Sequence, residues 1–281
     1  MLTPKGKLYG DLTVACLNEE KFMIFGSGAA QEMHRRWFEK FLPKKDVIYK
    51  NRSDDFHGIA ISGPNSRKLL SKICRDDVSD KAFKFRDTRE TFVGGVPAIL
   101  NRISFSGELG YEIYVAPQFQ LKLFEEIELH GKEFSLKLYG ARALMALRLE
   151  KNWGAWTLDF RPDFTAAESG LDTFINWDKD FIGKDSAQKD ESKNKLVPLI
   201  IETNDIDVTY NEAVLKGDKS IGYITSGGFA HFVNKSVAFS YIDQNEIKSD
   251  KGIQVEINGD FFNCSIIKEP LYDPSGQKMR S

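Results

Sequence analysis

Glu112 stands where its carboxylate could bind a ligand, inside "ISFSGELGYEIYV" (residues 103–115), in which glycines interrupt a strand-like alternation. Glycines at 107 and 110 permit positive φ angles or a close backbone approach, which would turn the chain around a ligand. A carboxylate accepts two parallel N–H bonds from a guanidine-like edge, which suits an aminopyrimidinone ring. The alternative from the pattern alone is a bulged edge strand with a solvated Glu112.

Asp11 is the second candidate, in "KGKLYGDLTV", a predicted strand whose other positions include Leu8, Leu12 and Val14. Aspartate is disfavoured in strands, and Gly10 permits close approach of another backbone or a ligand. A partly buried carboxylate would interact strongly with a nitrogen-rich or cationic ligand, because low dielectric strengthens the attraction. Simple alternation, with Asp11 turned to solvent, is the open alternative.

Three further motifs have structural explanations. "FMIFGSGAAQEMH" lacks the third glycine of a dinucleotide fingerprint, Gln31 standing in its place, so we expect an ordinary strand-to-helix turn. "GARALMALRLEKNW" (residues 140–153) predicts an amphipathic helix with an ion pair, although Arg142 could hold an acidic ligand tail. "GYITSGG", which contains Thr225 and Ser226, is expected to be a turn.

Composition excludes several function classes. The chain has 281 residues and a formal charge of −2, with both signs mixed, which gives no basic stripe for nucleic acid. Its three cysteines are far apart and its four histidines isolated, so neither disulfides nor a metal site is predicted. No apolar run reaches the roughly 20 residues that span a bilayer, and the start has no signal-peptide core. We expect a soluble, cytoplasmic protein without a membrane partner.

Strands and helices follow one another in an irregular order along the part of the chain that must position these residues. The pattern predicts a hairpin over residues 7–26, a helix over 30–42 and a buried strand, turn and helix over 57–73. Further strands and helices follow without a regular βαβ cadence, so the fold class is α+β. The polar segment 184–195 is the predicted boundary. Short strands with K-G-D and N-G-D turns follow it, which indicates a C-terminal all-β barrel. The expected domains are residues 1–190 and 195–281.

Taken together, these segments resemble the aminomethyltransferase family, which includes the glycine-cleavage T-protein and the folate domains of dimethylglycine and sarcosine dehydrogenases. The resemblance covers nearly the whole chain, and the dehydrogenase branch is the more similar, through "MLTPKGK" and "LRLEK". The matching blocks, in order, are "MLTPKGKLYGDLTV", "GIAISGPNSRKLL", "RISFSGELGYEIYV", "ALMALRLEKNW", "AESGLDTFINWDKDFIGKD", "GYITSGG" and "EPLYDP".

The resemblance implies a tetrahydrofolate cofactor and assigns residues to it. The position matching Asp11 serves the transfer chemistry in the family. "FSGELGYE" corresponds to the family's Y-T-G-E-x-G-x-E, which gives pterin recognition to Glu112 and puts Phe105 at the usual tyrosine, with loss of a hydroxyl. Leu144 occupies the position of an arginine found in glycine-cleavage members, so Arg142 is a nearby substitute. The expected cofactor-binding residues are Glu112, Phe105, Tyr111, Arg142 and Trp153.

The expected activity is a folate-dependent one-carbon transfer that forms methylenetetrahydrofolate from an iminium or aminomethyl donor. A flavoprotein oxidoreductase or an aminomethyl carrier protein is the implied partner. Family members carry several dozen residues before the block matching "MLTPKG", so the N-terminal part of the family pattern is missing. This departure and the lost hydroxyl at Phe105 favour two alternatives: a non-catalytic folate-binding module, or the folate subunit of a split dehydrogenase. The presence of Asp11 at the position that serves the transfer chemistry favours the enzyme over these alternatives.

Overall fold

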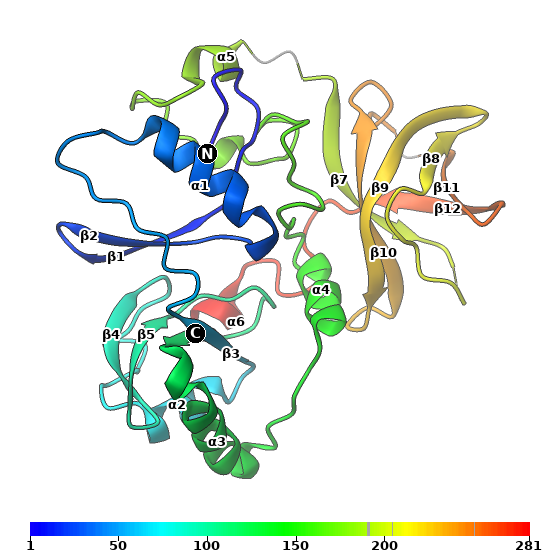
Figure 1. Ribbon diagram of the computed structural model, residues 1–281. Coiled ribbons are helices and arrows are strands. Elements are labelled where there is room, and N and C mark those ends of the chain that lie inside the picture. Colours follow the sequence, from blue (N-terminus) through cyan, green and yellow to red (C-terminus); the bar gives the residue numbers. More distant parts are fainter. Residues whose placement is uncertain (190–191, 204, 250) are drawn as a thin grey trace. The chain divides into compact units, whose positions relative to one another are not determined.

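The structure is a computed structural model that describes residues 1–281 except 190, 191, 204 and 250 (Figure 1). It divides into two compact units, each built from several segments of the chain. The first contains residues 1–12, 26–34 and 145–272; the second contains residues 13–25, 35–144 and 273–281. Each unit is described by itself below.

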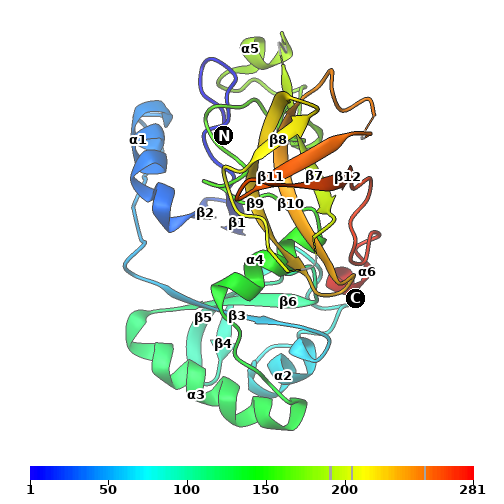
Figure 2. The ribbon, with the colours of Figure 1, turned by 90° about the vertical axis from the view of Figure 1, so that its right-hand side faces the viewer.

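A four-stranded antiparallel sheet forms the centre of the second unit. Its strand order is β3 (His57–Ser62), β6 (Gly110–Val115), β5 (Val96–Asn101) and β4 (Thr88–Val93). The helices α2 (Ser66–Ile73) and α3 (Gln120–Gly131) cover one face, as Figure 2 shows. Apolar residues at alternate strand positions pack beneath them, which is the period that a half-covered sheet requires. The most buried of these strand residues are Val93, Leu100, Ile113 and Val115.

The predicted hairpin is confirmed in part. β1 (Thr13–Asn18) pairs with β2 (Lys21–Phe25), and the α1 helix (Gln31–Phe41) follows after a 3-10 turn. Because β1 and β2 are antiparallel, no βαβ unit precedes α1, which agrees with the ordinary turn expected there. Residues 7–12 are not part of β1. They follow a tight turn of their own, closed by a bridge between Leu2 and Leu8.

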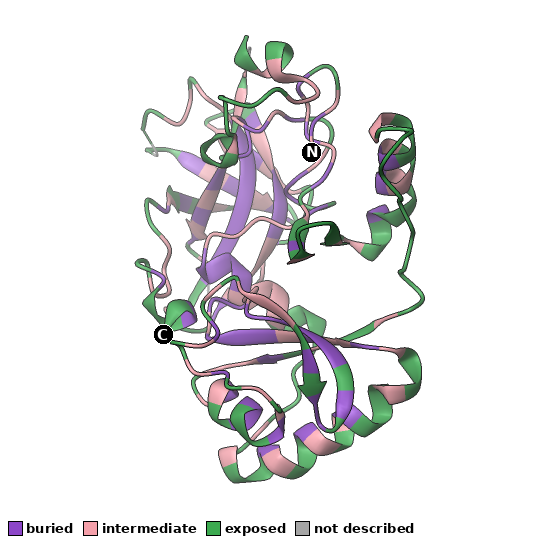
Figure 3. Cartoon of the chain, turned by 90° about the vertical axis from the view of Figure 1, so that its left-hand side faces the viewer, coloured by how far each residue is buried: buried purple, intermediate pink, exposed green. Residues whose placement is uncertain are grey.

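The first unit contains the predicted barrel, which is confirmed. It is a closed, antiparallel barrel with the order β10–β7–β12–β11–β8–β9. The turns at Gly217 and at Asn258-Gly259 have positive φ angles, as tight hairpins require. Figure 3 shows how much of these strands is buried. The strands are β7 (Asn194–Ile201), β8 (Ala213–Lys216), β9 (Lys219–Ala230), β10 (Lys235–Asp243), β11 (Ile253–Ile257) and β12 (Asp260–Ile266).

The described residues also form the helices α4 (Ala141–Glu150), α5 (Lys184–Gln188) and α6 (Gln277–Arg280). The α5 helix occupies the start of the predicted boundary segment, of which residues 190 and 191 lie outside the described residues. The domain limits 1–190 and 195–281 therefore stay a prediction. Mixed helices and sheets together with a closed barrel confirm the α+β class. Within the described part of the chain, no helix has the length and apolar character to cross a membrane.

Candidate functional site

Glu112 projects from the face of the sheet opposite α2 and α3. Along β6, Tyr111 and Ile113 are buried in the core, whereas Glu112 and Tyr114 lie on the other face and are half-buried. Their partners across β3 are Ala60 and Gly58, both exposed. These residues carry no side chain beyond Cβ. The Tyr114 ring packs against Gly58, so the open part of this face is the exposed Ala60 beside the Glu112 carboxylate, which a planar ring could cover. The strand β3, expected to be buried, is mostly exposed on this face.

Two tyrosines interact with Glu112. The Tyr114 hydroxyl donates a hydrogen bond to Glu112 Oε2 at 2.5 Å. Burial, and then the negative charge of Glu112, raise the pKa of Tyr114 far above its usual range. The same two causes raise the pKa of Tyr139, which precedes α4. Both phenols are thus neutral at physiological pH, and Tyr114 acts as a hydrogen-bond donor to Glu112.

The loop before β6 differs from the predicted interrupted strand. Residues 102–109 form a connection between β5 and β6 instead. Gly107 has a φ of 85°, and a Cβ on Gly110 would lie 3.0 Å from the carbonyl oxygen of Ile103. The loop is tied by its own serines, since Ser104 Oγ accepts a hydrogen bond from the Gly107 N–H at 3.1 Å. The glycines therefore shape the loop itself, and Phe105 is half-buried on it.

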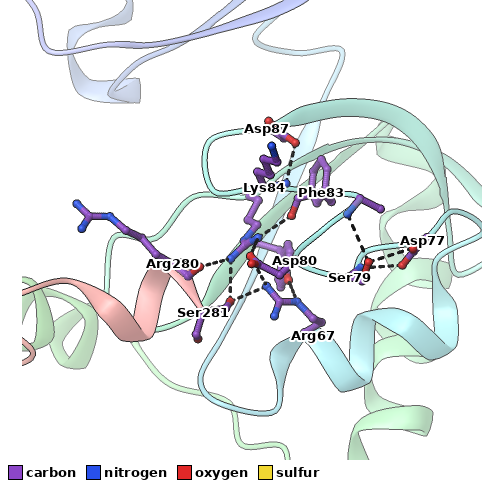
Figure 4. A network of polar contacts seen from close by, with 12 residues as sticks. Arg67, Asp77, Ser79, Asp80, Phe83, Lys84, Asp87, Arg280 and Ser281 are labelled. Carbon is purple, nitrogen blue, oxygen red and sulfur yellow. Dashed lines mark hydrogen bonds and ion pairs between the residues drawn. The ribbon is translucent and has the colours of Figure 1, made fainter.

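Arg102 anchors the start of this loop. Its partners Asp80, Phe83, Arg280 and Ser281 are labelled in Figure 4. Its side chain is fully buried, and Nη1 donates to Asp80 Oδ1 and to the carbonyl oxygen of Phe83, both at 2.6 Å. Nη2 donates to the carbonyl oxygens of Arg280 at 2.9 Å and Ser281 at 2.7 Å. The guanidinium holds the pKa of Asp80 below its usual value. A buried charge surrounded by acceptors fixes the backbone from which the loop departs.

A groove of about 560 Å³ runs along the outer edge of β3. Ala60 and Tyr139 line it, and so does Leu144, at the position where the resemblance expected an arginine. Arg142 is exposed in the first turn of α4. Tyr111 is placed elsewhere: it is 1% exposed, stacks on Phe83 in the core, and accepts a hydrogen bond from Arg67 Nε at 3.0 Å. This position gives Tyr111 a packing role and corrects its expected contact with the cofactor.

Asp11 lies in the first unit, two residues before β1 rather than within a strand. It is exposed to solvent on one side. Nevertheless, the surrounding protein partly desolvates the carboxyl group and raises its pKa, opposed by the Met1 ammonium group. The close approach at Gly10 is made by His34 and Met1, because a Cβ there would lie 2.9 Å from His34 Nε2 and 2.6 Å from Met1 Cε. The absence of a side chain at Gly10 thus leaves room for the side chains of Met1 and His34, not for a ligand.

The remaining expected residue, Trp153, follows α4 in the first unit and is half-buried. Its carbonyl oxygen accepts a hydrogen bond from Arg148 Nη1 at 2.9 Å, and Arg148 is paired with the buried Asp159. Thr225 and Ser226, expected in a turn, lie instead within β9 and donate to Asp159 Oδ1 at 2.5 and 2.6 Å. The expected ion pair lay within the helix, whereas Arg148 pairs with Asp159 beyond its end, in a buried network that also contacts β9.

The structure brings Glu112, Tyr114 and Tyr139 together in the second unit, which also contains Phe105 and Arg142. Asp11 and Trp153 belong to the first unit. The sequence analysis missed both tyrosines. Strand alternation could have found Tyr114, since residues two apart on a strand share a face. Tyr139 has no such signal.

Fold and site together define an α+β protein with a closed C-terminal barrel and a carboxylate on an open sheet face. Two family models match the chain: the GCVT N-terminal domain at residues 1–179 and the glycine cleavage T-protein C-terminal barrel domain at residues 194–273. The chain belongs to the aminomethyltransferase, or glycine-cleavage T-protein, family.

Individual relatives agree with this family. The mitochondrial dimethylglycine dehydrogenase of Homo sapiens is 36% identical over 279 residues, which are 96% of this chain and 32% of the relative. The chain thus spans about a third of that protein. An aminomethyltransferase of Thermoanaerobacter pseudethanolicus is 29% identical over 283 residues, 99% of this chain and 76% of the relative. The crystal structure of the glycine cleavage system aminomethyltransferase T from Bartonella henselae has the same fold. Its TM-score is 0.84 at 21% identity, over 98% of this chain and 75% of that one.

Proposed function

We propose that this chain is a tetrahydrofolate-dependent one-carbon transferase in which Glu112 holds the pterin ring. The observation that carries the proposal is the open surface beside Glu112, where its exposed partner Ala60 has only a methyl side chain. An aminopyrimidinone ring offers two parallel N–H groups to one carboxylate, and a charge-assisted pair of this kind contributes more than neutral hydrogen bonds. Phe105, Trp153 and the exposed Arg142 are the further proposed folate contacts, Arg142 for the acidic tail.

The proposed reaction is capture of a methylene-iminium by a folate nitrogen, which gives methylenetetrahydrofolate. The iminium is delivered on a secondary amine or an aminomethyl carrier. We assign to Asp11 the orientation of the folate amine and the stabilisation of positive charge that develops during transfer. Its raised pKa reflects a partly desolvated carboxyl, the setting in which such an interaction is strongest. A flavoprotein oxidoreductase is the proposed donor partner, and the cytoplasm the proposed location.

The second candidate is a folate-binding module without turnover. Phe105 favours it, because the hydroxyl that the family pattern places there is absent. Asp11 separates the two candidates, since a binding module has no need of a charge that acts only during transfer.

Tetrahydrofolate is expected to stabilise the folded chain. A ligand that binds only the native state adds RT ln(1 + [L]/Kd) to the free energy of unfolding, about 2.7 kcal/mol at 100 times Kd. Thermal melts with and without reduced folate measure this effect, with p-aminobenzoylglutamate as the control that lacks a pterin. A melting temperature that is unchanged at millimolar tetrahydrofolate would remove the folate proposal.

Glu112→Gln is expected to weaken tetrahydrofolate binding by roughly 10-fold or more, about 1.5 to 3 kcal/mol for a hydrogen bond to a charged group. Glutamine keeps the size of the side chain but offers a donor where the ring also has donors. Titration calorimetry gives the affinity. The matched control is Glu90→Gln, an exposed strand residue of the same sheet, which should bind as the wild type does. Equal affinity in the Glu112 variant would make its carboxylate a solvated surface group.

A further inference from the structure

The hydrogen bond between Tyr114 and Glu112 restricts the carboxylate. Both side chains lie on the same face of β6, two residues apart. In the part of the chain that the structure describes, Tyr114 is the one residue that hydrogen-bonds the Glu112 side chain. Because Tyr114 uses only one lone pair of Oε2, both carboxylate oxygens can still accept hydrogen bonds from a ligand.

Tyr114 is itself fixed by packing. Its ring contacts Phe25 with the centroids 4.4 Å apart. On the β3 side it lies against Gly58, where an added Cβ would come within 2.9 Å of the ring. Gly58 is thus needed to seat the tyrosine, and a ring held on two sides sets the direction of its hydroxyl. Packing therefore fixes the donor, and the donor orients the acceptor.

The strength of this contact follows from burial. A phenol whose pKa lies well above its usual value stays protonated over the working pH range, so Tyr114 remains a donor to the carboxylate. Hydrogen bonds to a charged acceptor are about twice as strong as neutral ones. A free glutamate side chain would otherwise rotate about its terminal torsion, which is broad for this residue type.

We propose that Tyr114 is a positioning residue that orients the Glu112 carboxylate so that both of its oxygens face the N–H edge of the bound pterin. The inference rests on the proposed function. It assigns to Tyr114 no contact with the reacting atoms. A preoriented carboxylate loses less conformational freedom on binding, which favours affinity for the ring.

The test is a double-mutant cycle on tetrahydrofolate affinity. Tyr114→Phe keeps the ring and removes the hydroxyl, and we expect it to weaken binding by about 5-fold. In the Glu112→Gln background the same change should have no further effect, because the group that Tyr114 orients is already altered. Tyr241→Phe is the control for a lost buried tyrosine hydroxyl, since Tyr241 donates to Asp159 O inside the first unit. It should lower the melting temperature and leave the affinity unchanged.

Gly58→Ala is a second variant that tests the positioning role of Tyr114. The added methyl group would displace the Tyr114 ring, so this variant should reproduce the loss of affinity without touching either polar group. It also keeps the proposal testable if Tyr114→Phe fails to fold. Unchanged affinity in both Tyr114→Phe and Gly58→Ala, or losses that add to that of Glu112→Gln, would overturn the positioning role.

A ligand-free measurement separates the two proposals. In protein labelled at the tyrosine ζ carbon, the Tyr114 resonance should shift in Glu112→Gln, because its acceptor changes. An unshifted resonance would overturn the positioning inference even if folate binds. A shifted resonance in a protein that binds no tetrahydrofolate would instead overturn the proposed function, and the contact would stand as a structural one.

Discussion

Asp11→Asn is expected to cut turnover by roughly 100-fold while leaving tetrahydrofolate affinity within a few fold. A carboxylate that acts on charge developing in the transition state affects kcat, and a 100-fold loss corresponds to about 2.7 kcal/mol. Asparagine keeps the shape of the side chain and removes its charge. The measurement is methylenetetrahydrofolate formation at saturating folate, in parallel with calorimetric affinities. Asp178→Asn, an exposed aspartate of the same unit, is the matched control.

The same substitution has an expected effect on stability, with the opposite sign. Burial raises the pKa of Asp11 in the folded chain, so its ionisation disfavours folding as the pH rises through the normal carboxyl range. Asp11→Asn removes this penalty. The variant should therefore melt at the same temperature as wild type or higher at pH 7, and the difference should shrink as the pH falls.

The turnover measurement decides the role of Asp11. Equal turnover in variant and wild type would exclude Asp11 from the transfer step.

Asp159→Ala is expected to lower the free energy of unfolding by about 3 to 5 kcal/mol, because it leaves the fully buried Arg148 guanidinium without its carboxylate. Asp159 also accepts hydrogen bonds from Thr225, Ser226 and the Ala155 N–H. Ser226 and the Ala155 N–H would lose their acceptor in the interior, whereas Thr225 would keep its contact with the Phe239 carbonyl oxygen, so the loss increases further. Urea denaturation of the variant and the wild type measures the difference.

Two variants sharpen this test. Asp163→Ala removes an aspartate of the same unit that is 71% exposed, and it should change stability by no more than about 0.5 kcal/mol. The double variant Arg148→Met, Asp159→Leu replaces the buried pair by apolar groups and should recover much of the stability lost in Asp159→Ala. A loss below about 1 kcal/mol in Asp159→Ala would show that the network does not support the fold.

Periodicity predicted most of the elements and the barrel. The alternating strands after residue 194 and the K-G-D and N-G-D turns were sufficient, because hairpin turns and strand alternation are local properties. The helical spacing of Met33, Trp37, Phe38 and Leu42 likewise predicted α1. Boundaries were harder: the strand expected from Lys7 begins at Thr13, since a local turn holds the first eight residues.

Side-chain partners from distant segments could not be predicted. Glu112 was found from the glycines around it, and the structure shows that these glycines shape the loop before β6. Asp159 lies in an irregular segment, and its partner Ser226 is 67 residues away. Tyr111 was assigned to the cofactor although strand alternation places it opposite Glu112. Strand alternation is a local property and would have placed Tyr111 on the core face of β6. The Asp159 network depends on tertiary packing and has no such local signal.

The most direct test of the transferase is product formation by the wild-type chain. Dimethylglycine or sarcosine is oxidised by a flavoprotein dehydrogenase without a folate domain, with tetrahydrofolate present, and methylenetetrahydrofolate is quantified with and without this chain. The account predicts a rate that rises with the concentration of the chain and exceeds the spontaneous condensation of formaldehyde with folate. A chain that binds tetrahydrofolate but gives no product above that background with either donor would contradict the transferase and leave the binding module.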